Sequence, residues 1–198
     1  MLFPVDSSNI LGIVEAFAGA VDGKTVYTAG HSLRVAEYSV LVGEELDLTE
    51  KEISMLRFAA LLHDIGKINV PRDILNKAGE LTPEEWEVIK AHPRTGAEIV
   101  ARVEFFKELA PAIYYHHEYF NGRGYPGELA GADIPVEARI IAVTDAYEAM
   151  TSVRPYRKGF SHRDALARLK EGGGWQFDVD IVECFIKSIR RRKDSMRT

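Results

Sequence analysis

Histidine and aspartate are the residues of this chain best suited to metal chemistry, because imidazole nitrogens and carboxylate oxygens bind divalent transition-metal ions. The candidates are His31, His63, Asp64, His92, His116, His117 and Asp145. Most fall on the inward face or near an end of a predicted helix, where an unpaired charge or imidazole is costly. A single inward histidine is usually a hydrogen-bonded core residue, whereas five histidines with two aspartates favour a metal site.

Two adjacent pairs in this set have spacings that suit ligation. His63 and Asp64 offer a nitrogen and a carboxylate within one helical turn, and a carboxylate can bridge two cations. His116 and His117 project about 100° apart if they lie on a helix, so both can line one cavity. Asp145 lies on the apolar side of a later predicted helix and is expected to complete the set of ligands. The pairs predict one site built from several helices.

Helix ends are expected to position the first of these side chains. The helical spacing of apolar residues from His31 to Val42 places His31 at the head of an apolar stripe. Thr49 and Glu52 form a capping box, which predicts the start of the next helix. That helix carries His63 at its far end.

The later candidates follow the same pattern. Thr82 and Glu85 form a second capping box, and the helix that they begin is expected to end near His92, which precedes a proline. Residues 109–119 form the predicted helix that bears the adjacent histidine pair. Helical spacing then returns from Ala138 to Ala149, around Asp145.

Residues 121–135 are predicted to form a long loop, because they hold four glycines and two prolines in an otherwise helical chain. Long ordered loops are often functional. Two further helices are expected, one beginning near Ser161 and one over 178–193. Strand-length alternation, internal repeats and a domain break are missing from the sequence. The predicted fold is all-α, a compact helical bundle with one long loop.

Composition narrows the class of protein. The 198 residues carry a net charge of −5, with 25 Lys and Arg against 30 Asp and Glu, which disfavours binding of long nucleic acids. The only cysteine, Cys184, excludes an intramolecular disulfide and a zinc site built from several thiolates. The sequence shows no signal peptide or membrane span, so we expect a cytoplasmic protein that does not bind a membrane. Trp86 and Trp175 are expected in the core.

The ordered series of motifs resembles a known family. It comprises His31 in GHSLRVAEYS, HDIGKINVPRDILNK from His63, His92 in KAHPRTG, HHEYFNGRGYPGELAG from His116, VTDAYEAMTSVRPYR around Asp145, and QFD. From about Tyr27 to Asp178 the chain closely resembles the HD-GYP branch of the HD phosphohydrolase superfamily. That family consists of helical, metal-dependent phosphodiesterases that open bacterial cyclic dinucleotides, above all cyclic di-GMP. The resemblance therefore implies an HD-type helical bundle with a long GYP loop.

The resemblance also implies roles for individual residues. It implies one metal ion held by His31, His63, Asp64 and Asp145, and a second held by His92, His116 and His117. Asp64 would bridge the two ions, which are iron or manganese in such sites. It further implies substrate contacts from Lys67, Tyr125, Arg154 and Arg157, of which Tyr125 shapes the pocket and the basic residues contact phosphate.

The expected reaction is hydrolysis of a phosphodiester bond. Two cations roughly 3.5–4 Å apart can share and deprotonate a water, so we expect a bridging hydroxide to attack cyclic di-GMP. Asp64 and Lys67 are the expected catalytic residues, and the products would be the linear dinucleotide and then GMP. Two alternatives stay open. One is another HD-type nucleotide phosphohydrolase, and the other is a non-catalytic receptor for a cyclic dinucleotide.

Three positions depart from the family pattern without removing a ligand. Asn121 and Glu148 stand where many members have aspartate, and the loop reads GELAG where Gly-Leu is common. Tyr27 lies four residues before His31, where some members have a glutamate able to hold a third cation. Because tyrosine is a poorer ligand, we expect two metal ions.

Residues 1–24 are expected to form an N-terminal helical extension, and residues 25–198 the HD-GYP phosphodiesterase domain. A sensor or receiver domain, or a regulatory protein, is an expected partner. A homodimer that pairs through the first helix is a further expectation, although the apolar face of that helix would equally suit the core.

Overall fold

The computed structural model describes residues 7–25, 29–127, 129–153 and 158–195. Its helices are α1 (Ser7–Asp22), α2 (His31–Glu45), α3 (Glu50–Leu62), η1 (Ile65–Asn69), α4 (Arg72–Leu75), α5 (Pro83–Lys90), α6 (His92–Val100), η2 (Glu104–Leu109), α7 (Ala110–Tyr115), η3 (Gly131–Asp133), α8 (Val136–Thr151), α9 (His162–Glu171) and α10 (Val179–Ser195), where η marks a 3₁₀-helix. Within these residues the only β-type pairing is an isolated bridge between Gly173 and Phe177. The all-α prediction is confirmed.

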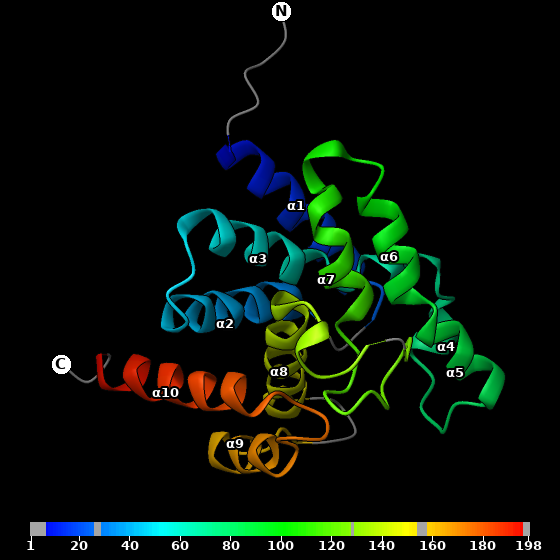
Figure 1. Ribbon diagram of the computed structural model, residues 1–198. Helices are drawn as coiled ribbons and strands as arrows, with labels where there is room; N and C mark the ends of the chain where they lie inside the picture. Colours follow the sequence, from blue (N-terminus) through cyan, green and yellow to red (C-terminus); the bar gives the residue numbers. More distant parts are fainter. Residues whose placement is uncertain (1–6, 26–28, 128, 154–157, 196–198) are drawn as a thin grey trace, which may run out of the picture.

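Helix α8 lies in the middle of the bundle (Figure 1). It packs against α2, α7, α9 and α10, and its inward side chains Ile140, Ile141 and Val143 are fully buried. Because Asp145 follows these residues on the same helix, the core holds this carboxylate at a fixed place.

Helix α1 packs against α2, α3 and η1 through Val14, Ala18 and Val21, which are buried in the main core. The inner face of α1 therefore belongs to the hydrophobic core. The outer face carries Ile13 and Phe17, whose exposed fractions are 55% and 58%. The predicted domain boundary between residues 24 and 25 stays a prediction.

Helix starts agree with the sequence signals, and helix ends agree less well. Both predicted capping boxes are present, at Thr49 and at Thr82. Helix α7, however, ends at Tyr115 rather than 119, so His116 and His117 lie just beyond it. The His116 imidazole donates to the carbonyl oxygen three residues earlier, a local competitor for the helical hydrogen-bond ladder. The short elements η1, α4 and η2 were not predicted.

The prediction that both tryptophans are buried is wrong. Trp86 and Trp175 have exposed fractions of 43% and 48%. Helix α5, which carries Trp86, has no buried residue at all. The sequence signals that predict the helix α5 therefore do not show that this helix packs in the core.

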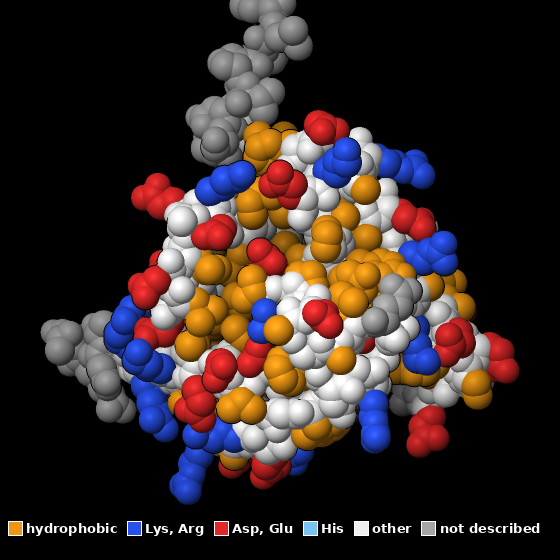
Figure 2. Space-filling model, viewed as in Figure 1, with side chains coloured by type: hydrophobic (Ala, Val, Ile, Leu, Met, Phe, Trp, Pro, Cys, Tyr) orange, Lys and Arg blue, Asp and Glu red, His pale blue; other side chains and the backbone are white. Residues whose placement is uncertain are grey.

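Hydrophobic side chains gather around a hollow between α3 and α7 (Figure 2). This cavity has a volume of about 450 Å³ and is lined by Met55, Ala59, Leu109 and Ala112 among others. None of the candidate metal ligands lines it. No helix within the described residues is long and apolar enough to span a membrane.

Candidate metal centre

The fold brings all seven candidate ligands together. We call His31, His63 and Asp64 the first ligand group, and His92, His116 and His117 the second. Within each group, one potential ligand atom per residue lies within 4.8 Å of the others. Asp145 adjoins the first group, with its Oδ1 3.3 Å from His31 Nε2 and 4.0 Å from His63 Nε2. The chain thus gathers an all-nitrogen and oxygen donor set from several helix ends and from the interior of α8.

Asp64 lies between the two groups. Its Oδ2 is 3.8 Å from His31 Nε2 and 3.5 Å from His63 Nε2. Its Oδ1 faces the other way and is 3.2 Å from His92 Nε2. One carboxylate therefore presents a different oxygen to each group, as a bridging ligand would.

Three of the histidines are oriented in the same way. The Nδ1 atoms of His63, His92 and His116 donate to main-chain carbonyl oxygens three residues earlier, at 2.7, 2.6 and 2.7 Å. A carbonyl oxygen only accepts, so Nδ1 carries a ring proton, and in the neutral imidazole the lone pair is then on Nε2. Each ring thus caps a carbonyl at the end of a helix and directs a potential ligand nitrogen into the centre.

The arrangement of these nitrogens fits a bound cation. The Nε2 atom of His63 is buried and has no hydrogen-bonding partner among the described residues. The Nε2 atoms of His92 and His116 face each other at 3.4 Å, and in the neutral rings protonated at Nδ1 both would carry lone pairs. Because unpaired buried polar atoms are costly, a cation between these nitrogens resolves both features. Imidazole and carboxylate together suit a divalent first-row metal.

His31 is held by a side chain instead of the main chain. Its Nδ1 lies 2.5 Å from Oε2 of Glu148. Glu148 is itself buried and accepts hydrogen bonds from Arg34 and Ser152. In the sequence, Glu148 stands out only as a departure from the family pattern. Its spacing of three residues from Asp145 places both carboxylates on one helix face, which was a usable signal.

Charge differs sharply between the two groups. Burial alone would lower the pKa of His31, but hydrogen bonds to Asp145 and Glu148 raise it to about 10. Burial, reinforced by His92, lowers the pKa of His117 to about 3. Burial would raise the pKa of Asp64, yet the adjacent Lys67 ammonium keeps it well below its usual value. The first group is therefore rich in ions, whereas burial favours the neutral imidazole of His117 in the second.

A glycine allows the two groups to meet. A Cβ atom on Gly66 would lie 2.0 Å from the carbonyl oxygen of His92 and 2.6 Å from the amide nitrogen of Gly96. Any larger residue would push η1 away from α6. Because Asp64 immediately precedes η1 and His92 begins α6, this contact brings the carboxylate beside the second group.

The predicted GYP loop borders the centre. The amide of Tyr125 donates to the carbonyl of His117 at 3.1 Å, and the two rings lie 4.7 Å apart. The amide of Gly127 donates to Oε1 of the buried Glu118 at 2.7 Å. Gly124 approaches so closely that a Cβ would lie 2.2 Å from the Tyr119 amide nitrogen. The loop is thus fixed to the segment that carries the histidine pair.

One side of the centre is open. His117, Asp145 and Lys67 are partly exposed, whereas His63 and His92 are buried. A small cavity of about 160 Å³ is lined by His117, Asp145 and other residues. Lys67 lies on η1, and its Nζ is 2.6 Å from Oδ2 of Asp64. A ligand would meet these side chains first.

Three residues of interest lie outside the described part of the chain. They are Arg154 and Arg157, the expected phosphate contacts, and Tyr27, the position compared with a third-metal ligand. Their expected roles stay predictions.

Known proteins share both sequence and fold with this chain. The HD domain family matches residues 20–181. A 3'3'-cGAMP-specific phosphodiesterase 3 from Vibrio cholerae is 40% identical over 96% of this chain and 42% of its own length. The cyclic di-GMP phosphodiesterase response regulator RpfG from Xanthomonas campestris is 38% identical over 86% of this chain and 46% of its own length.

A solved structure agrees with the fold. The crystal structure of a cyclic GMP-AMP-specific phosphodiesterase from V. cholerae superposes with a TM-score of 0.70 at 21% identity, over 90% of this chain and 48% of that one. The chain therefore spans less than half the length of the relatives described here. Because the family match covers most of the chain, this protein belongs to the HD domain family, within which it resembles the HD-GYP phosphodiesterases.

Proposed function

We propose that this chain is a metal-dependent phosphodiesterase that hydrolyses a cyclic dinucleotide. The observation that carries the proposal is the position of Asp64, whose two oxygens face two separate groups of histidines. A centre with a shared carboxylate is typical of two-metal hydrolases, which act on phosphate esters. The substrate class is supported by relatives whose names describe them as phosphodiesterases of cyclic dinucleotides.

The proposed ligand set follows the two groups. His31, His63, Asp64 and Asp145 would hold one divalent ion, and His92, His116 and His117 would hold another, with Asp64 shared. Iron and manganese are the proposed occupants, because both accept imidazole and carboxylate ligands. When bound, such a pair activates water at neutral pH and neutralises charge on phosphate.

The chain's own residues would bind and orient the substrate. The Lys67 ammonium, held 2.6 Å from Asp64 and partly exposed, is placed to pair with a non-bridging phosphate oxygen. Burial would lower the pKa of Lys67, but Asp64 raises it, so the ammonium keeps its charge at neutral pH. Tyr125 would form one wall of the substrate pocket beside His117. Arg154 and Arg157 are proposed as further phosphate contacts.

Cyclic di-GMP is the proposed substrate, and the mixed cyclic AMP-GMP is the alternative. The curated relatives divide between these two ligands by name. The proposed product is the linear dinucleotide, followed by GMP.

Two other functions compete with this proposal. One is hydrolysis of nucleotide monoesters by the same metal chemistry. The other is binding of a cyclic dinucleotide without turnover. A complete set of seven candidate ligands favours catalysis, because a receptor does not need them.

The test is incubation of manganese-loaded or iron-loaded protein with cyclic di-GMP, 3'3'-cGAMP and cyclic di-AMP, followed by identification of products by liquid chromatography and mass spectrometry. We expect a linear dinucleotide from at least the first of these. Binding without any product would favour the receptor. Release of phosphate from nucleotide monoesters, with cyclic dinucleotides untouched, would favour the other hydrolase.

The predicted partners and the division at residue 24 are kept as proposals. Pairing through α1 is tested by substituting its half-exposed outer side chains, Ile13 and Phe17, and measuring the mass in solution.

A further inference from the structure

We propose that Trp86, with Tyr125, forms a stacking surface for a nucleobase of the substrate. This inference rests on the proposed function and adds a binding residue whose sequence context predicts burial in the core. Trp86 lies on α5, where its exposed fraction is 43%. A large exposed aromatic side chain beside a candidate active site is available for a ligand.

Aromatic rings lead outward from the metal centre to Trp86. The His117 and Tyr125 rings lie 4.7 Å apart with an interplanar angle of 32°. The Tyr125 and Trp86 rings follow at 6.4 Å and 72°, an edge-to-face arrangement. His117 is a proposed metal ligand, so the chain of rings begins where the phosphate would bind.

The spacing suits a nucleotide. In a nucleotide the base is separated from its phosphate by a single ribose. A phosphate at the centre would therefore place one base near Tyr125 and Trp86, two ring contacts away from the ligand histidines. Every nucleobase has a π-face, so stacking on tryptophan holds a base without selecting its identity.

Backbone hydrogen bonds of the GYP loop hold Tyr125 in a fixed position. The Tyr125 amide is bonded to the His117 carbonyl, and the following Gly127 amide is bonded to Glu118. Because the loop is fixed in this way, the Tyr125 ring keeps its edge-to-face contact with Trp86 before a ligand binds. A preformed surface loses less conformational entropy when it binds a base.

Steady-state kinetics of the full chain test the proposal. We expect Trp86→Ala to raise KM for the hydrolysed cyclic dinucleotide by roughly ten- to a hundredfold, with kcat changed less than about twofold. Trp86→Phe should give an intermediate KM, because phenylalanine keeps a smaller stacking face. Metal content should equal that of the wild type in both variants.

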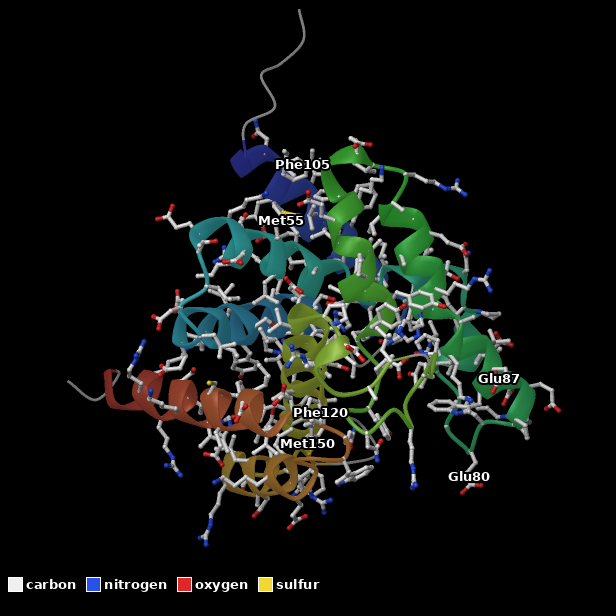
Figure 3. The ribbon with its side chains drawn as sticks, in the orientation of Figure 1. Met55, Glu80, Glu87, Phe105, Phe120 and Met150 are labelled. Carbon is white, nitrogen blue, oxygen red and sulfur yellow. The ribbon has the colours of Figure 1, made fainter. Side chains whose placement is uncertain are left out.

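Phe105→Ala is the matched control. Phe105 is also a half-exposed aromatic residue, with an exposed fraction of 53%. It lies far from α5, at the other end of the molecule from Glu87, the neighbour of Trp86 (Figure 3). Its removal should leave KM unchanged.

Fluorescence gives an independent readout because the chain has only two tryptophans. In metal-loaded Trp175→Phe protein, the hydrolysis-resistant phosphorothioate analogue of cyclic di-GMP should quench the remaining emission from Trp86. If the wild type hydrolyses a cyclic dinucleotide but Trp86→Ala leaves KM unchanged, the assignment of Trp86 is wrong and the proposed function stands. If the wild type hydrolyses none, the proposed function fails and the assignment fails with it.

Discussion

Both ligand groups contain histidines, but only the first contains a carboxylate, and the two groups have opposite electrostatics. In the first group, His31 lies among the carboxylates of Asp64, Asp145 and Glu148, and its pKa is raised to about 10. In the second, three imidazoles share one buried space, and the pKa of His117 is lowered to about 3. The contrast indicates that the carboxylates, rather than the histidines, distinguish the two proposed metal positions.

One ring of the first group is held differently from the others. His63 of the first group and His92 and His116 of the second donate to main-chain carbonyls, which no side-chain substitution can remove. His31 of the first group depends instead on the Glu148 side chain. The first position can therefore be weakened selectively by mutation, which makes the comparison testable.

Removal of the shared ligand should have the largest effect. Asp64→Ala takes away the carboxylate that faces both groups, so we expect loss of both bound metals and hydrolysis below detection. Metal analysis and product formation measure this. Asp133→Ala, which removes an exposed carboxylate in the GYP loop, is the control. Substantial hydrolysis by Asp64→Ala would refute the shared role.

Single-ligand variants should separate the two groups. We expect His31→Ala and His117→Ala each to keep about one metal ion per chain and to lose at least roughly a hundredfold in kcat, because the proposed centre needs both ions. His162→Ala is the control, since that exposed residue bonds to Tyr147 away from the ligand groups. Retention of both metals by either variant would remove that residue from the ligand set.

Glu148→Gln should weaken only the first position. Loss of a carboxylate that orients a ligand histidine typically lowers metal affinity by roughly 10–100-fold. We expect a competing chelator to remove the ion of the first position more readily from this variant than from the wild type. The ion of the second position should be removed equally readily from both proteins. Ser152→Ala, which deletes a 2.5 Å hydrogen bond to Glu148 but keeps the carboxylate, should have a smaller effect. Equal loss of both ions would contradict the distinction.

Metal removal should lower thermal stability moderately. The ligands converge from several helices, so bound ions stabilise the folded state by mass action. We expect chelation to lower Tm by roughly 5–15 °C, and added manganese to restore it. The Asp64→Ala variant should show no such shift. An unchanged Tm in the wild type would mean that the centre binds ions weakly or not at all.

Much of the fold was predictable because its signals are local. Thr49 and Thr82 mark helix starts through capping boxes that involve residues only three positions away. The glycines and prolines of residues 121–135 likewise mark the loop. The end of α7 was not predictable from spacing, because the His116 side chain takes a carbonyl from the helical ladder.

The gathering of the seven candidate ligands was expected, but their supporting contacts were not. Glu148 contacts His31 across 117 positions of sequence, a pairing that depends on how α2 packs against α8. The exposure of Trp86 likewise depends on α5 lying outside the core. The spacing of Glu148 from Asp145 indicates a shared helix face, but neither the partner of Glu148 nor the place of α5 outside the core can be read from the sequence pattern.

The metal content of the wild-type protein tests the central claim most directly. Protein purified and dialysed without chelator is analysed for metals by inductively coupled plasma mass spectrometry. The two ligand groups predict about two ions of iron or manganese per chain. A ratio of one or less after loading with either metal, or a third tightly bound ion, would contradict a two-ion centre bridged by Asp64.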